Sequence, residues 1–90
     1  MNKDKKAVAL EYNSEEHAVP QITASGRGGV AENIIERARN SDVEIYKNEE
    51  LVKELIQFKV GTEIPKELYE IVAQILIFVE GVDSINLTDN

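Results

Sequence analysis

The stretch GTEIPKELYEIVAQIL, residues 61–76, carries the strongest structural signal in the chain. Its apolar residues recur at helical spacing and continue to residue 79, so that they make one wide apolar face. They are Leu68, Ile71, Val72, Ile75, Leu76 and Val79. Pro65 suits a first helical position, because proline has no N–H that the helix would need there, and Gly81 suits a stop. The stretch therefore predicts an amphipathic helix from Pro65 to the residues just before Gly81.

Another helix is predicted upstream, in NEELVKELIQF, residues 48–58. Its apolar face consists of Leu51, Leu55 and Phe58, with Val52 and Ile56 beside them. Asn48 suits the N-cap, because its side chain can accept a hydrogen bond from a backbone N–H of the first turn. We expect this helix to end at Gly61.

A third helix is predicted to begin at Val30, where the spacing of apolar residues becomes helical. Its apolar residues are Val30, Ile34 and Ala38, which recur at intervals of four, and Ala31 and Ile35, which lie beside them. Charged residues fill the remaining positions, so the helix is amphipathic. We expect it to end near Asn40.

Three segments alternate between apolar and other residues, as strands do. They are AVALEY at residues 7–12, a shorter segment at 21–24, and VEIYK at 43–47. The first two suggest a hairpin, and the helix before the third suggests a crossover within the same sheet. The pattern predicts a single domain of the α/β (α+β) class with three strands and three helices.

Length and charge restrict the kinds of protein this can be. With 90 residues, the chain has room for one compact domain. Its net charge of −7 repels nucleic acid, and it contains no cysteine for disulfides or thiolate ligands. No signal peptide is evident, and the most apolar run is too short to span a bilayer. We expect a cytoplasmic protein with a charged segment at residues 1–5, a domain at 6–81 and a flexible tail at 82–90.

Candidate catalytic residues are few. The one histidine, His17, stands beside two glutamates in a polar segment, where a solvated loop residue is more plausible than a metal ligand. Acidic pairs such as Glu49 with Glu50, and Glu67 with Glu70, fall on faces that we expect to be exposed. The serines have no second histidine or nucleophile elbow near them. We therefore predict no enzyme activity, no metal and no cofactor.

The glycine-rich stretch TASGRGGVAENI, residues 23–34, raises the possibility of a phosphate loop. No lysine followed by Ser or Thr comes after Gly29, as a Walker loop requires. The dinucleotide fingerprint matches only in part, with Ala31 at its third position and Glu44 near the expected distance for the acidic residue. A purely steric corner is the preferred interpretation, and a small anion- or nucleotide-binding site at residues 25–30 is the alternative.

The order of these segments resembles, over residues 6–80, the cytoplasmic C-terminal domain of the FlhB/YscU family of flagellar and type III secretion export proteins. The most specific piece is GTEIPKELYEIVAQIL, which is similar to the family pattern G-x-x-IP-x-x-LY-x-x-VA-x-x-L. The resemblance implies a small central mixed sheet of three to four strands, surrounded by about three helices. It also implies a part of the secretion gate that receives export substrates and helps to switch export from rod and hook components to filament components.

Full-length family members carry an N-terminal membrane domain and cut themselves within an Asn-Pro-Thr-His motif. The corresponding positions here hold Asn2, Lys3, Asp4 and Lys5, so only the asparagine matches. Because Lys3 replaces the proline that helps to define the strained turn, we predict no self-cleavage. The chain looks like a free-standing counterpart of the fragment that cleavage produces.

The resemblance also implies a hydrophobic patch for early export substrates, at Val19, Pro20, Ala73 and Leu76. Alternatively, Ala73 and Leu76 are core positions of the last helix. The expected partners are export-gate proteins, namely the FlhB membrane domain and an FlhA-type component, together with early substrates, and not nucleic acid. We expect a monomer that meets the membrane only through its partners; a folded paralogue without a partner is a further alternative.

Overall fold

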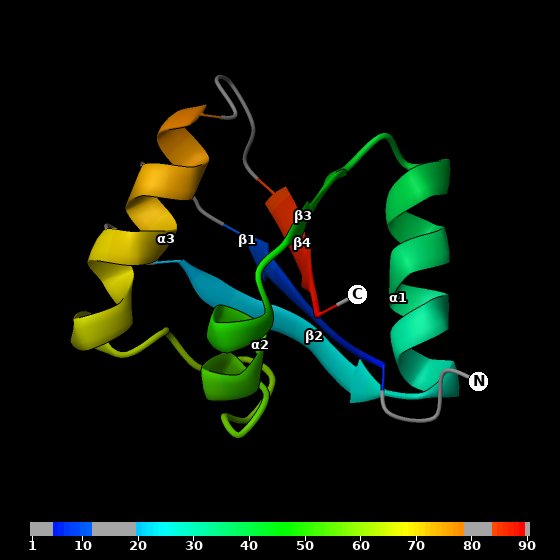
Figure 1. Ribbon diagram of the computed structural model, residues 1–90, viewed down its shortest axis with the longest axis horizontal. Helices are drawn as coiled ribbons and strands as arrows, with labels where there is room; N and C mark the ends of the chain where they lie inside the picture. Colours follow the sequence, from blue (N-terminus) through cyan, green and yellow to red (C-terminus); the bar gives the residue numbers. More distant parts are fainter. Residues whose placement is uncertain (1–4, 12–19, 79–83, 90) are drawn as a thin grey trace.

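The computed structural model describes residues 5–11, 20–78 and 84–89, apart from the side chains of residues 76–78. The elements in chain order are β1 (Lys6–Glu11), β2 (Gln21–Arg27), α1 (Gly29–Asn40), β3 (Glu44–Lys47), α2 (Glu49–Leu55), α3 (Lys66–Phe78) and β4 (Ser84–Thr88). Figure 1 shows α1 on one side of the sheet and α2 and α3 on the other. This mixed sheet between helices confirms the predicted fold class.

The four strands lie in the order β2-β1-β4-β3. β1 runs antiparallel to both of its neighbours, whereas β3 runs parallel to β4. The predicted hairpin of the first two strands is therefore confirmed. Their register shifts between Ala9 and Leu10, which pair with Ala24 and Ile22, so Thr23 is the extra residue of a bulge. β2 continues to Arg27, three residues beyond the predicted strand.

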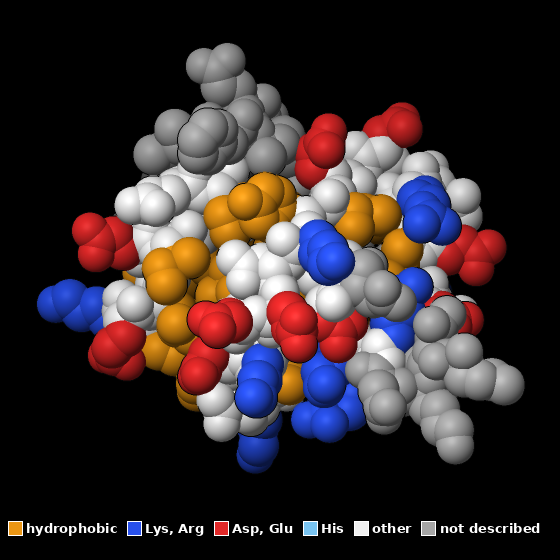
Figure 2. Space-filling view, in the orientation of Figure 1, with side chains coloured by type: hydrophobic (Ala, Val, Ile, Leu, Met, Phe, Trp, Pro, Cys, Tyr) orange, Lys and Arg blue, Asp and Glu red, His pale blue; other side chains and the backbone are white. Residues whose placement is uncertain are grey.

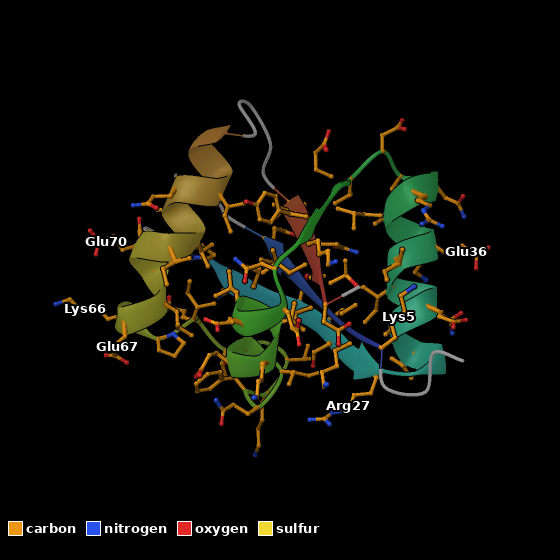
Figure 3. The ribbon with its side chains drawn as sticks, in the orientation of Figure 1. Lys5, Arg27, Glu36, Lys66, Glu67 and Glu70 are labelled. Atoms are coloured by element: carbon orange, nitrogen blue, oxygen red, sulfur yellow. The ribbon has the colours of Figure 1, made fainter. Side chains whose placement is uncertain are left out.

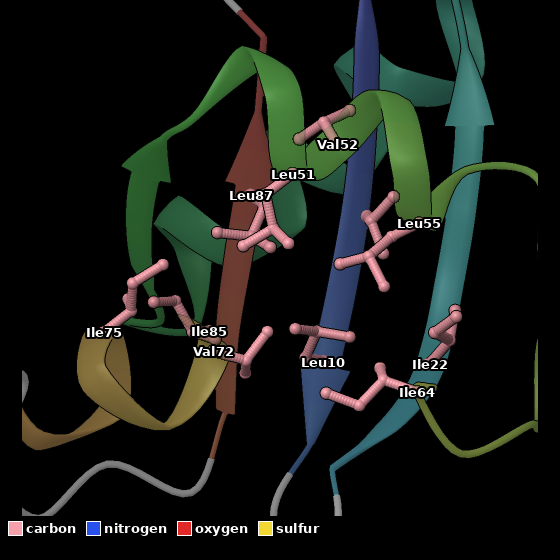
Figure 4. Close-up of a cluster of buried hydrophobic side chains, with 11 residues drawn as sticks. Leu10, Ile22, Leu51, Val52, Leu55, Ile64, Val72, Ile75, Ile85 and Leu87 are labelled. Atoms are coloured by element: carbon pink, nitrogen blue, oxygen red, sulfur yellow. The ribbon is translucent and has the colours of Figure 1, made fainter. Parts of the chain in front are cut away.

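The larger hydrophobic core lies between the sheet and the α2–α3 layer (Figure 4). Its buried members are Val8, Leu10, Ile22, Leu51, Val52, Leu55, Ile64, Val72, Ile75, Ile85 and Leu87. The alternation of β1 explains this arrangement, since Val8 and Leu10 point to one face and Ala7 to the other. Both faces of β1 are buried, as expected for an inner strand.

The smaller core on the other face of the sheet consists of buried Ala7, Ala31 and Ile35. The predicted helix is present, but the residues that it buries are not the set that recurs at intervals of four. Ala31, Ile35 and Ala38 are buried, whereas Val30 is 54% exposed. Tertiary packing explains the difference. Small residues let α1 approach the sheet closely, whereas the bulkier Val30 lies at the flank of the helix.

The predicted cap of α2 is confirmed, because the side chain of Asn48 accepts a hydrogen bond of 3.0 Å from the backbone N–H of Leu51. The predicted end is wrong, however: α2 stops at Leu55 rather than near Gly61. α3 begins at Lys66, one residue after the proline expected to start it.

The prediction of a flexible tail at residues 82–90 is wrong for residues 84–88. Residues 84–88 form β4, which pairs with β1 on one side and β3 on the other. Ile85 and Leu87 are each 1% exposed, so this segment is part of the main core. Pairing with residues far away in the chain makes this short segment a strand, and the domain extends beyond residue 81.

Candidate binding surface

The turn that precedes α3 is held against the start of β2 by backbone hydrogen bonds. The N–H of Gly61 donates to the carbonyl of Ile22 at 2.7 Å, and the N–H of Ile22 donates to the carbonyl of Thr62 at 2.9 Å. Gly61 has a φ of 93°, which glycine adopts readily and other residues rarely do. The positive φ of Gly61 explains why the start of the stretch at 61–76 requires a glycine.

The next residues of this stretch place α3 on the sheet. The N–H of Ile64 donates to the carbonyl of Pro20 at 3.1 Å, and its side chain is buried in the main core. The carbonyl of Pro65 then accepts hydrogen bonds from the N–H groups of Leu68 and Tyr69, at 2.9 and 3.1 Å. The Ile-Pro pair thus anchors the chain and begins the helix.

The structure describes two of the four predicted docking residues completely. Pro20 is fully buried at the start of β2, so its own side chain is not available to a partner. Ala73 is half-buried on α3. Val19 and the side chain of Leu76 lie outside the described part of the chain. The backbone bond from Ile64 to Pro20 does bring the start of β2 close to the start of α3.

The exposed apolar surface includes residues of the wide apolar face predicted for α3. Ile71 is 45% exposed, while Leu68 and Tyr69 are half-buried against the main core. Figure 2 shows hydrophobic side chains gathered on the α3 side of the molecule, with acidic side chains around them. The sequence already indicated that part of this face would be exposed, because the predicted apolar face is wider than the neighbouring elements of one helix can cover. We call Leu68, Tyr69, Ile71 and Ala73 the α3 surface.

Charged residues of α3 point away from the sheet. Figure 3 shows Lys66, Glu67 and Glu70 on the outer side of the helix, and all three are exposed. Glu49 and Glu50 are likewise exposed on α2. Among the described residues, no three acidic or histidine side chains are grouped as a metal site would require. His17 lies outside the described residues.

Lys5, the last of the four positions compared with the family's cleavage motif, lies far from the α3 surface. Of these positions, only Lys5 is described; Asn2, Lys3 and Asp4 are not. The carbonyl of Lys5 accepts a hydrogen bond of 2.8 Å from the N–H of Gly28, at the end of β2 opposite to its start beside α3. The length of β2 separates the two sites by roughly 20 Å, at about 3.3 Å for each residue. Figure 3 shows Lys5 and Arg27 on the far side of the molecule from α3.

The glycine-rich segment is built into the fold. Gly26 and Arg27 pair with β1, and the N–H of Gly28 is taken by Lys5, so these groups are not arranged as a phosphate loop. A dinucleotide site would need Glu44 on the strand next to β2. β3, which carries Glu44, instead forms the opposite edge of the sheet. The geometry supports the steric corner.

No helix in the described ranges is long and apolar enough to cross a bilayer.

Comparison with known proteins gives a match to one family model over residues 1–79, described as the FlhB HrpN YscU SpaS family. The uncharacterized protein YlqH of Bacillus subtilis is 39% identical over 79 residues, which cover 88% of this chain and 85% of that protein. The flagellar biosynthetic protein FlhB of Aquifex aeolicus is 36% identical over 74 residues, which cover 81% of this chain and 21% of FlhB.

FlhB of Helicobacter pylori is 44% identical over 68 residues, which cover 74% of this chain but only 19% of that protein. The chain therefore spans about a fifth of these flagellar relatives. The crystal structure of the PscU C-terminal domain superposes with a TM-score of 0.78 at 21% identity, covering 83% of this chain and 96% of that domain, which shows a shared fold. The chain belongs to the FlhB/YscU family.

Proposed function

We propose that this member of the FlhB/YscU family is a non-enzymatic binding module of the flagellar or type III export apparatus. It associates on the cytoplasmic side with export-gate proteins, an FlhB membrane domain and an FlhA-type component, and contributes to substrate recognition or to specificity switching. The observation that supports this most strongly is the family match over residues 1–79, which includes the whole of the turn and helix that carry the α3 surface.

The α3 surface offers a chemistry suited to such binding. Ile71 is 45% exposed, with half-buried Leu68 one turn before it. Half-buried Tyr69 and Ala73 lie one turn apart on the other flank of the helix, so α3 offers shallow apolar area on both flanks. Burying one aliphatic side chain contributes about 1.5–3 kcal/mol, so a short apolar segment of a substrate would bind weakly and leave again. Transient binding of this kind suits a component that passes substrates on.

The proposed module acts without cutting itself. Lys3 stands where family members that cleave have proline, so the turn that activates the asparagine is not encoded at this position. The proposed role is therefore recognition alone.

The test combines binding with complementation. Ile71→Asp and Ala73→Asp would place a carboxylate in the α3 surface, and Val60→Asp, at a residue that is 56% exposed outside α3, is the matched control. Each variant is expressed in a flagellated host whose FlhB lacks the C-terminal domain, and motility, hook export and capture of solubilised gate components are measured.

We expect the wild-type chain and Val60→Asp to restore hook export and to capture gate components. Ile71→Asp and Ala73→Asp, folded by circular dichroism, are expected to lose both activities. Failure of the wild-type chain to restore export or to associate with any gate component would contradict the proposed function. Equal activity of all three variants would exclude the α3 surface as its site.

A further inference from the structure

The two faces of β1 carry side chains of different size. On one face, Val8 and Leu10 belong to the main core. On the other face, Ala7 and Ala9 point to α1, and Ala9 lies opposite Ala24 of β2. Ala7 is fully buried, but Ala9 and Ala24 are only half-buried. α1 therefore covers one end of this row of small residues and leaves the other end partly uncovered.

A hollow of about 240 Å³ lies between this uncovered part of the sheet and α1. Ala9 and Ala24 line it from the sheet, and Ile34, Ala38 and Ser41 line it from the helix and its C-cap. Small residues on both sides explain the space, because a closely packed interior would need larger side chains there.

Hydrogen bonds hold the walls of this hollow in place. The side-chain amide of Asn86, another lining residue, donates to the carbonyl of Ile34 at 3.0 Å, which ties β4 to α1. Beyond the end of the helix, the N–H of Val43 donates to the carbonyl of Ala38 at 2.8 Å. The hollow is thus a built part of the fold.

Arg37 gives the hollow its charge. It is the one charged residue among the described residues that line the hollow, and it is exposed on α1. Arg37 also lines a second hollow along the flank of α1, together with Val30, Ile34 and Glu36, and Figure 3 shows Glu36 pointing outward. No described residue forms an ion pair with Arg37. We call the two joined hollows the α1 groove.

The size and charge of the α1 groove favour one kind of occupant. The inner hollow, about 240 Å³, is below the usual range for small-molecule pockets and suits a single large side chain. The groove continues along the helix, so a peptide that carries this side chain has room beyond the hollow. Since the net charge of −7 repels acidic segments elsewhere, the unpaired Arg37 attracts a carboxylate to this place.

We propose that the α1 groove is a docking site for an acidic peptide segment of a partner protein. One large aliphatic or aromatic side chain of that segment enters the hollow over Ala9 and Ala24, and a neighbouring carboxylate pairs with Arg37. The α1 groove lies on the opposite face of the sheet from the α3 surface, and it does not depend on the proposed function.

A peptide selection tests this chemistry. A phage-displayed library of random seven-residue peptides is selected on the full chain and counter-selected on Ala24→Leu, which fills the hollow. We expect the enriched peptides to share one large apolar residue with an aspartate or glutamate close to it. If Ala24→Leu is not folded by circular dichroism, Ser41→Tyr, which covers the hollow from an exposed position, takes its place.

The affinity of the synthesised consensus peptide is then measured by fluorescence anisotropy at about 0.15 M salt, which screens distant charges. Ala24→Leu should weaken binding about 10- to 100-fold, because one apolar side chain is no longer buried. Arg37→Gln should weaken it about 3- to 10-fold, and this loss should disappear when an amide replaces the peptide carboxylate. Arg39→Gln removes an exposed charge outside the groove and, as the matched control, should change binding by less than about twofold.

The proposal is overturned if no peptide is enriched over the counter-target, or if the consensus contains no acidic residue. It is also overturned if Arg37→Gln and Arg39→Gln weaken binding equally. If light scattering finds a dimer of the wild-type chain that Ala24→Leu abolishes, the groove takes a second copy of this chain, and an acidic partner is the wrong occupant.

Discussion

Gly26 is required at its position by its neighbour Val30. A Cβ added at Gly26 would lie 2.7 Å from the Cβ of Val30 and closer still to its Cγ1, inside any normal contact. Gly26→Ala is therefore expected to lower the free energy of unfolding by about 1–3 kcal/mol, the usual cost of overpacking. Urea unfolding followed by circular dichroism measures this change.

The matched test of this contact is the double variant. Val30→Ala removes the Cγ1 atom, the nearest to the added methyl group, so Gly26→Ala should cost less in that background. If both backgrounds lose the same free energy, the contact with the Cγ1 atom of Val30 is not the cause. If Gly26→Ala leaves the free energy of unfolding unchanged, β2 accommodates the added methyl group and glycine is not required there.

Lys3 leads to a prediction about chemical integrity. Since lysine cannot supply the turn that proline helps to define in the family motif, the purified chain is expected to keep its full mass of 10.1 kDa on prolonged incubation. Intact-mass spectrometry and N-terminal sequencing check this. The triple substitution Lys3→Pro, Asp4→Thr and Lys5→His restores the motif and serves as the comparison. A fragment beginning at Lys3 in the wild-type protein would contradict the prediction.

Among the elements, β4 is the one that was not predicted, and a substitution in it tests whether residues 84–88 belong to the core. Leu87 is 1% exposed in the main core, so Leu87→Ala is expected to lower the free energy of unfolding by about 2–5 kcal/mol. Val60→Ala, at a residue that is 56% exposed, should change it by less than about 0.5 kcal/mol. Chemical denaturation of both variants gives the comparison. Equal effects would mean that residues 84–88 are a tail after all.

The elements that sequence reasoning predicted are those whose signals are local. Asn48 specifies the start of α2, and Pro65 specifies the start of α3 within one residue, whereas the end of α2 was predicted six residues too late. β4 has only two large apolar residues, and its strand-forming partners are remote: the contact from Lys6 to Asp89 joins residues 83 positions apart. No local pattern reports such a pairing.

The candidate site was predictable to a similar extent. Ala73 is half-buried on α3, as a surface position requires. Pro20 is buried, because the turn at residues 61–64 packs against the start of β2, and that contact joins segments about forty residues apart. Periodicity placed Ile71 on the apolar face of the helix but could not show that it is 45% exposed, because the pattern gives the width of such a face and not how much of it the neighbouring elements cover.

At the scale of the whole molecule, the net charge of −7 opposes compactness, because the exposed carboxylates repel one another. Glu54 is exposed in the last turn of α2, where the helix dipole disfavours an anion, and Glu50 lies one helical turn before it. Glu54→Lys would convert this repulsion into an attractive pair with the favourable orientation. Together these effects should raise the free energy of unfolding by about 0.5–1 kcal/mol at low salt.

Salt separates this electrostatic gain from any change in packing. Since the Debye length falls from about 30 Å at 0.01 M to about 8 Å at 0.15 M, the advantage of Glu54→Lys should shrink as sodium chloride is added. Thermal unfolding of both proteins across this range measures it, with Glu54→Gln, which removes the charge without reversing it, expected in between. A gain that is independent of salt would assign the effect to packing, and a loss would show that Glu54 stabilises α2 through a contact of its own.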